Sequence, residues 1–169
     1  MGVTDLREDE VPVGPPLPLG RRIELPDRGI TFVRELPGPT EDAPALLLLH
    51  GWIASAGLNW FQTFDALSEH FRVIALDQRG HGRGMRTWKR FRLADCADDA
   101  AALIDILALD PVIVVGYSMG GTIAQLLCRR HPHLADEHGI GPAGLTDMEC
   151  APFVALHPRR HVGFVRPVA

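Results

Sequence analysis

Ser118 lies in the pattern Gly-Tyr-Ser-Met-Gly at residues 116–120, with a glycine two positions before and two positions after the serine. An apolar, largely β-branched run at 111–115 precedes the pattern, and residues 122–130 have the composition of a helix that ends in two arginines. A serine at a sharp strand-to-helix turn exposes its hydroxyl and places its backbone at the positive end of the helix. The glycines are needed because strand and helix approach closely there. The pattern predicts a nucleophilic serine.

Two other groups of glycine and polar residues follow predicted strands. His50-Gly51-Trp52 comes after the apolar residues 45–49, and the run Asp-Gln-Arg-Gly-His-Gly at 77–82 closes an apolar strand over 72–77. The carboxyl ends of parallel strands lie at one edge of a sheet, which is where sites form in such sheets. The three groups therefore predict one site at this edge.

The elements that must position these groups alternate between strands and helices. Residues 21–25 and 30–36 alternate in polarity around a Pro-Asp-Arg-Gly turn and predict an antiparallel hairpin. Helical spacing of apolar residues predicts helices over 59–71 and 93–109. This order predicts the α/β class: a mostly parallel sheet flanked by helices, with an antiparallel hairpin at its start.

In this order and spacing, the three motifs resemble the α/β-hydrolase fold family, in its serine-nucleophile branch. The resemblance covers the N-terminal portion of that fold, from about residue 22 to about residue 134. It implies that Ser118 is the nucleophile and that the backbone N–H groups of Trp52 and Met119 form the oxyanion hole. The sequence contains no metal-binding cluster and no prosthetic-group motif, so no metal and no cofactor are expected.

The resemblance also bears on three polar residues near the serine. It implies that His50 and His81 shape loops and do not catalyse, and we expect Asp77 to be a hydrogen-bond acceptor at a strand end. The glycines at 80–84 follow a Gly-x-Gly-x-Gly spacing, which differs from the dinucleotide-binding Gly-x-Gly-x-x-Gly, and no helix opens directly after them. Nucleotide binding is not expected.

The function implied by the resemblance is that of a serine hydrolase or esterase that acts on small-molecule acyl bonds through an acyl-enzyme. The family also contains acyltransferases, peroxidases and carbon–carbon hydrolases, and the cap region that usually distinguishes them is not recognisable here. The substrate is not readable from the sequence.

The resemblance stops after about residue 134. Ser118 needs a base and an acid from later strands of the fold, but only 51 residues follow it in this 169-residue chain. Three further strand–helix units of roughly 30 residues each would not fit. The tail is rich in Gly, Pro, His and Arg, so we hypothesise a truncated gene product or a reading frame lost near 134–136.

Asp147, His157 and His161 occur in the order acid, then histidine, but no predicted strands position them. The alternative function is therefore a catalytically incomplete fragment that lacks the triad acid and histidine. An incomplete sheet leaves a strand edge exposed, which predicts self-association through that edge. The predicted organisation is a loose leader at 1–20, a partial hydrolase domain at 21–135 and an atypical, poorly ordered tail at 136–169.

Composition sets the remaining expectations. The net charge of −4 gives no electrostatic case for nucleic acid or for an anionic membrane surface. Three widely spaced cysteines match no metal site and no disulfide framework, and the acidic N-terminus lacks the apolar run of a signal peptide. These features predict a cytoplasmic protein with a small-molecule substrate.

Overall fold

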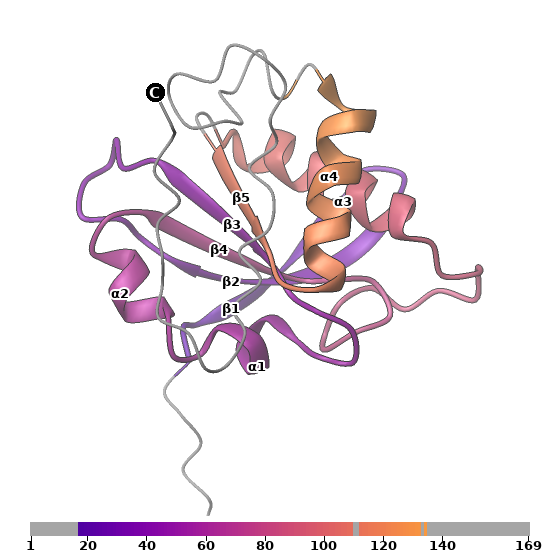
Figure 1. Cartoon of the computed structure of the whole chain (residues 1–169), viewed down its shortest axis with the longest axis horizontal. Coiled ribbons are helices and arrows are strands. Elements are labelled where there is room, and N and C mark those ends of the chain that lie inside the picture. The colour runs from indigo at the N-terminus through magenta and orange to yellow at the C-terminus, as the bar shows by residue number, and fades with distance from the viewer. Residues whose placement is uncertain (1–16, 110–111, 133, 135–169) are drawn as a thin grey trace, which may run out of the picture.

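The computed structural model describes residues 17–109, 112–132 and 134. Five strands form one open sheet with helices on both faces (Figure 1). The strands are β1 (Gly20–Leu25), β2 (Gly29–Leu36), β3 (Ala45–Leu49), β4 (Arg72–Asp77) and β5 (Val112–Gly116). The helices are α1 (Ala56–Trp60), α2 (Phe64–Ser68), α3 (Leu93–Leu107) and α4 (Met119–Arg130).

The strands lie in the order β1-β2-β4-β3-β5. β3 is parallel to both β4 and β5, whereas β2 is antiparallel to β1 and to β4. This confirms the α/β class, the parallel centre and the hairpin at the start. Among the described strands, none pairs with the outer side of β5, so the sheet is open there. Self-association through this edge stays a prediction.

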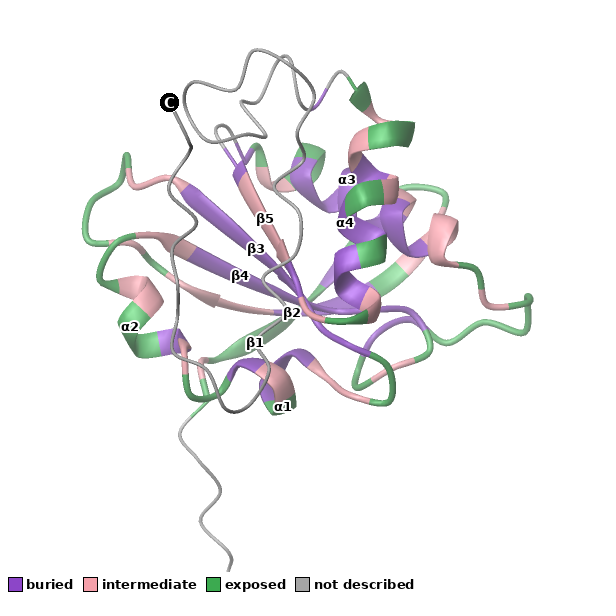
Figure 2. Ribbon diagram, in the orientation of Figure 1, coloured by how far each residue is buried: buried purple, intermediate pink, exposed green. Residues whose placement is uncertain are grey.

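Alternate residues of the central strands face opposite layers. Leu47 and Leu49 of β3 pack in the core beneath α3 and α4, whereas Leu46 and Leu48 pack against Trp60 and other residues of the α1–α2 layer. All five residues of β3 are buried (Figure 2). Because both faces of this strand are covered, its sequence is a continuous apolar run.

The helix predicted over 59–71 is instead two short helices, α1 and α2. The hydroxyl and the N–H of Thr63 both donate to the carbonyl of Trp60, at 2.9 Å each, and close a turn between the two helices. Serine and threonine side chains that bond nearby carbonyls compete with helix continuation. Periodicity found the apolar residues but not this break.

The helix predicted over 93–109 is confirmed as α3, but it ends at Leu107. Ala108 takes a left-handed conformation (φ 46°) and its N–H donates to the carbonyl groups of Asp105 and Ile104, which closes the helix. Of the predicted leader at 1–20, residues 1–16 lie outside the described part. The predicted tail at 136–169 lies wholly outside it.

Candidate active site

Ser118 stands between β5 and α4 in a strained conformation. Its φ of 52° and ψ of −114° lie outside the regions that L-residues ordinarily adopt. The turn is closed by the N–H of Gly120, which donates to the carbonyl of Tyr117 at 2.8 Å. Such backbone strain, held in place by the surrounding fold, is typical of functional sites.

The two glycines of the pattern lie where backbones meet. A Cβ on Gly116 would overlap the backbone of Gly120, and a Cβ on Gly120 would overlap the carbonyl oxygen of Leu49 at the end of β3. No flexible side chain is involved in either contact, so neither can yield. The serine turn therefore depends on both glycines.

The segment after β3 lies directly against the serine turn. A Cβ on Gly51 would stand 2.9 Å from the ring of Tyr117 and 3.4 Å from the Cβ of Ser118. The N–H of Tyr117 donates to the carbonyl of Leu49 at 2.9 Å. The structure thus brings together two of the three motifs that sequence reasoning placed at one edge.

Hydrogen bonds fix the peptide between His50 and Gly51 at both ends. The side-chain amide of Gln78 donates to the His50 carbonyl at 2.6 Å, and the Gly51 N–H donates to Oδ1 of Asn59 at 2.7 Å. Gln78 is buried at 2% exposure, and its Oε1 has no partner among the described residues. Sequence reasoning did not single out Gln78 or Asn59.

The ring of His50 is fully buried and its two nitrogens have different roles. The backbone N–H of Gln78 donates to Nε2 at 3.0 Å, so Nε2 is an acceptor and the proton resides on Nδ1. Nδ1 then donates to the Gly51 carbonyl at 2.8 Å. Burial lowers the pKa of His50, against a smaller opposing effect of that bond, which favours the neutral ring. His50 holds a loop, as expected.

The bond from His50 also orients the next peptide. In a planar trans peptide the C=O and the N–H point in opposite directions, so fixing the Gly51 carbonyl fixes the N–H of Trp52. Neither this N–H nor that of Met119 has a hydrogen-bond partner within the described part of the chain. Both predicted oxyanion donors are therefore unoccupied backbone groups.

Asp77 connects the loops at this edge. One carboxylate oxygen accepts from the N–H of Ala56 and the other from the N–H of Arg83, at 2.7 Å each. Asp77 is buried, and these bonds satisfy both of its oxygens, so it is a strand-end acceptor, as expected from the sequence.

His81 belongs to an aromatic cluster beside this edge. Its ring meets Trp52 at 5.1 Å and Phe91 at 5.6 Å between centroids, in edge-to-face geometry. Its Nδ1 lies 3.0 Å from the Arg79 carbonyl. Trp52 itself is 57% exposed, so the cluster presents apolar surface next to the serine turn.

A cluster of ion pairs connects the loop after β4 to α3 and to the β1–β2 hairpin. Both nitrogens of the Arg79 fork donate to the Asp99 carboxylate at 2.6 Å, and Arg28 also contacts Asp99. The hydrogen bonds to Asp99 raise the pKa of the Arg79 guanidinium. Residue spacing along the sequence could not predict this cluster, because its members come from three separate segments: the hairpin, the loop after β4 and α3.

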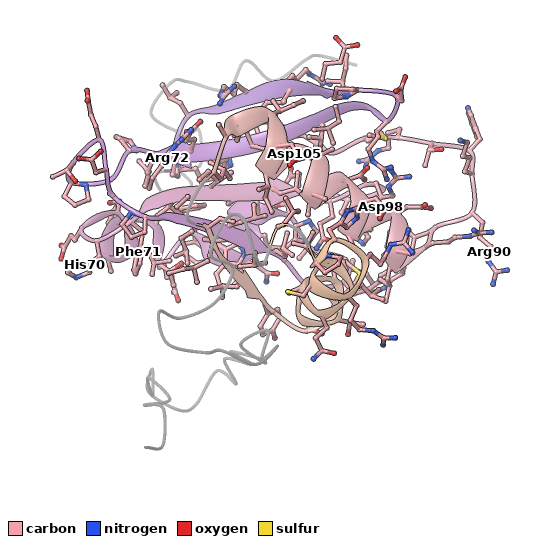
Figure 3. All side chains as sticks on the ribbon, turned by 90° about the horizontal axis from the view of Figure 1, so that it is seen from above. His70, Phe71, Arg72, Arg90, Asp98 and Asp105 are labelled. Atoms are coloured by element: carbon pink, nitrogen blue, oxygen red, sulfur yellow. The ribbon has the colours of Figure 1, made fainter. Side chains whose placement is uncertain are left out.

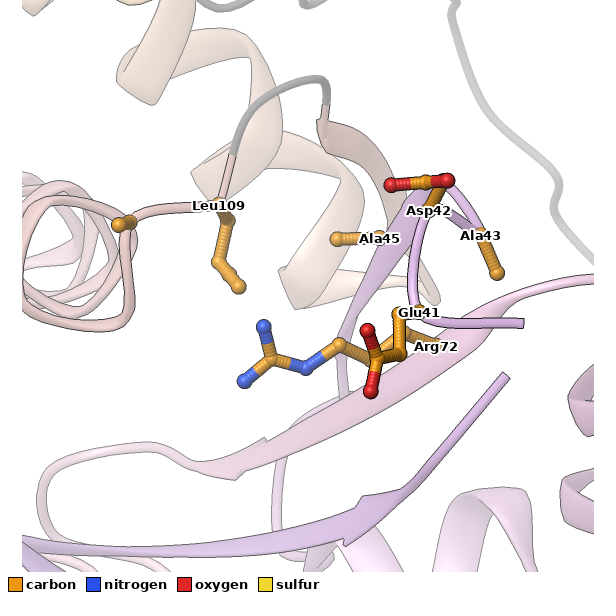
Figure 4. A pocket seen from close by; sticks show the side chains of 7 residues that line it. Glu41, Asp42, Ala43, Ala45, Arg72 and Leu109 are labelled. Atoms are coloured by element: carbon orange, nitrogen blue, oxygen red, sulfur yellow. The ribbon is translucent and has the colours of Figure 1, made fainter. Parts of the chain in front are cut away.

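A cavity of about 340 Å³ lies far from Ser118. It is lined by Ala45 and Arg72, the first residues of β3 and β4, together with residues of the neighbouring loops (Figure 4). Those two residues mark the amino ends of the strands, opposite the edge that carries the serine. The cavity therefore takes no part in the candidate site.

Within the described ranges, no group of three or more His, Cys, Asp or Glu side chains could hold a metal ion. No helix in the same part of the chain is long and apolar enough to cross a membrane. Cys96 is a buried free thiol, and burial raises its pKa to about 12. Cys128 is disulfide-bonded, which the spacing of the cysteines did not predict. The cytoplasmic location stays a prediction.

Comparison with known proteins agrees with this geometry. The chain is 38% identical over 97 residues to a bifunctional esterase/perhydrolase of Acinetobacter calcoaceticus, covering 57% of this chain and 34% of that protein. It is 37% identical over 114 residues to a probable 1-acylglycerol-3-phosphate O-acyltransferase of Oryza sativa, covering 63% of this chain and 27% of that protein. The chain thus spans about a third of the length of these relatives.

A solved structure and a family model cover the same region. The crystal structure of E-2-(acetamidomethylene)succinate hydrolase superposes with a TM-score of 0.62 at 33% identity, over 69% of this chain and 41% of that one. The model of the alpha/beta hydrolase fold matches residues 44–137, more than half of the chain. With the strand order, the serine turn and the three motifs, these matches establish that the chain belongs to the α/β-hydrolase fold family and represents part of that fold.

Proposed function

We propose that this chain carries the nucleophile and the oxyanion-binding groups of a serine hydrolase that acts on an ester or related acyl bond of a small molecule. The observation that carries the proposal is the packing of Gly51 against Ser118, 3.4 Å from the Ser118 Cβ to the position of a Gly51 Cβ. This contact brings a peptide with an unoccupied N–H beside the strained serine.

In the proposed reaction the Oγ of Ser118 attacks the carbonyl carbon, and the carbonyl electron pair moves onto oxygen. The N–H groups of Trp52 and Met119 donate to that oxyanion; such a donor contributes about 3 kcal/mol to lowering the barrier. Collapse breaks the bond to the leaving alcohol and leaves an acyl-enzyme, which water cleaves to the free acid. The serine proton passes through a base to the leaving alcohol.

A second candidate function is that of a catalytically incomplete fragment. The hydroxyl of Ser118 has no hydrogen-bond partner among the described residues. Both ring nitrogens of His50 are engaged in the loop, and His131 pairs with Asp98 at 2.8 Å. No described histidine is hydrogen-bonded to the Ser118 hydroxyl, which supports this alternative.

The names of two relatives support acyl chemistry as the reaction class. One is named an esterase/perhydrolase and another an O-acyltransferase, so the acceptor of the acyl group differs between them. For this chain we take water as the acceptor, so the proposed reaction is the hydrolysis of a small-molecule ester.

A fluorophosphonate probe, which reacts with activated serines, tests the proposal on the full chain. We expect labelling of the wild type and of the control Ser68→Ala, whose hydroxyl donates to the Asp65 carbonyl, but not of Ser118→Ala. If the folded wild type is not labelled, the incomplete-fragment alternative holds. Equal labelling of Ser118→Ala would exclude Ser118 as the nucleophile.

A further inference from the structure

The segment between β4 and α3 concentrates positive charge in an acidic chain. Residues 83–92, here called the basic loop, contain five cations, and no Asp or Glu occurs between Asp77 and Asp95. All five are exposed. The cations are Arg83, Arg86, Lys89, Arg90 and Arg92. None forms an ion pair with a carboxylate in the described residues. Arg83 lies over the ring of Phe32 and Arg86 donates to carbonyls of the loop after β4, so the charges most available to a partner are those of the other three cations.

The basic loop is anchored at both ends and projects between the anchors. Met85 is buried in the core, and Phe91 packs on the rings of Trp52 and His81. The Arg86 guanidinium donates to the carbonyl of Gly82 at 2.6 Å. Figure 1 shows the segment before α3 extending away from the sheet, and Arg90 lies at its outer end in Figure 3. The fold thus supports a projecting tip.

The tip carries a tryptophan with no apolar surroundings. Trp88 is fully exposed, and Lys89 and Arg90 follow it directly. The N–H of Lys89 donates to the Thr87 hydroxyl at 3.1 Å, which gives the tip a local turn. An exposed indole is unfavourable in water, whereas the boundary between lipid head groups and acyl chains suits its apolar body and its polar N–H.

We propose that the basic loop is a docking surface for an anionic phospholipid membrane, with Trp88 entering the interfacial region and the cations contacting the lipid head groups. The net charge of −4 led to the expectation of no membrane partner, but charges act locally because salt screens them over about 8 Å. Around Trp88 the nearest charges along the chain are the cations of its own loop. Clusters of Lys and Arg with an aromatic residue bind anionic bilayers in this way.

The observations favour a lipid surface over a single-stranded nucleic acid. Nucleic-acid channels stack successive bases on several aromatic side chains along a groove. Here one exposed indole stands at a projecting tip, and the other aromatic residue of the loop, Phe91, is engaged with Trp52 and His81. The inference does not depend on the chemistry of Ser118, so Ser118→Ala must bind vesicles as the wild type does.

Vesicle sedimentation with the full chain tests the proposal. We expect binding to phosphatidylcholine vesicles that contain about one third phosphatidylserine, weaker binding at high salt, and little binding to phosphatidylcholine alone. The double variant Lys89→Ala/Arg90→Ala should weaken binding on the order of 10- to 30-fold. Trp88→Ala should weaken it roughly 10-fold. All three positions are exposed, and circular dichroism checks that the variants fold.

Matched controls remove the same groups elsewhere. Arg22→Ala/Arg129→Ala removes two exposed cations, and Leu19→Ala removes an exposed apolar side chain; both should bind like the wild type. Equal binding to neutral and anionic vesicles, absence of binding, or an equal loss in the controls would overturn the proposal. Tighter binding of a single-stranded RNA than of anionic vesicles, with the same dependence on the basic loop, would assign the loop to nucleic acid instead.

Discussion

The loop after β3 and the serine turn lie in contact but differ in how completely they are held. The peptides around Gly51 are fixed by bonds from His50 and Gln78 and by one to Asn59. Ser118 is placed by backbone contacts alone, and its hydroxyl has no partner in the described residues. The loop after β3 is thus held by side-chain hydrogen bonds, whereas the described residues provide no hydrogen bond to the Ser118 hydroxyl.

The two regions differ because their hydrogen-bond partners come from different parts of the fold. The bonds of the β3 loop are supplied by α1 and by the residue after β4, which lie within the matched region. A base and an acid would come from later strands in this family. The hydrogen bonds that hold the β3 loop can therefore form within the matched region alone.

The largest effect is expected where the two regions touch. Gly120→Ala would drive a Cβ into the Leu49 carbonyl, so we expect a loss of about 3 kcal/mol in the free energy of unfolding, measured by urea denaturation. Gly57→Ala is the control, because its Cβ would meet the flexible ends of Leu17 and Arg34 at 3.1 and 3.3 Å. The control should stay within about 1 kcal/mol of wild type; equal stability of the two variants would contradict the close approach.

Asp77→Asn probes the connection between the loops. Asparagine offers one acceptor where the carboxylate offers two, so one of the N–H groups of Ala56 and Arg83 would face an NH₂ donor. The expected loss is about 2 kcal/mol in the same denaturation experiment. Asp65→Asn, at an exposed position of α2, should change stability by less than about 0.5 kcal/mol. An unchanged midpoint for Asp77→Asn would rule out this role.

Gln78→Leu should lower the free energy of unfolding by a smaller amount, about 1 kcal/mol. The substitution removes the donor to the His50 carbonyl, which destabilises the fold, but it also removes the buried Oε1 that has no partner among the described residues. The backbone bond from residue 78 to the His50 ring remains. Gln62→Leu, at an exposed position, is the matched control and should be neutral. A loss no larger than the control's would mean that the side-chain amide does not hold the loop.

The smallest expected effect is the contribution of His50 to the pH dependence of stability. Because the pKa of His50 is lowered in the fold, the unfolded chain takes up a proton first as pH falls below the ordinary value of 6.5. Stability is therefore complete above pH 6.5 and declines below it, and His50→Asn should lack this part of the dependence. Imidazole nitrogen NMR should find the proton on Nδ1; a proton on Nε2 would contradict the bond from Gln78.

How much could be predicted depended on the range of the interaction. The strands β3 and β4 were predicted with their observed ends, because a strand buried on both faces is a continuous apolar run. The break between α1 and α2 was missed because Thr63 acts through a local hydroxyl bond that apolar periodicity does not reflect. The roles of Asn59 and Asp99 were missed because these residues bond to loops that belong to other elements of the fold.

The sequence by itself determined the class of fold and the position of the serine turn, because apolar periodicity and glycine spacing are local consequences of backbone geometry. The family followed from the resemblance of the three motifs. The tertiary structure decided which polar groups hold the loop after β3, which nitrogen of the His50 ring carries the proton and which carboxylates are structural. Those outcomes depend on hydrogen bonds between elements that only folding brings together, such as Gln78 with His50 and Arg79 with Asp99.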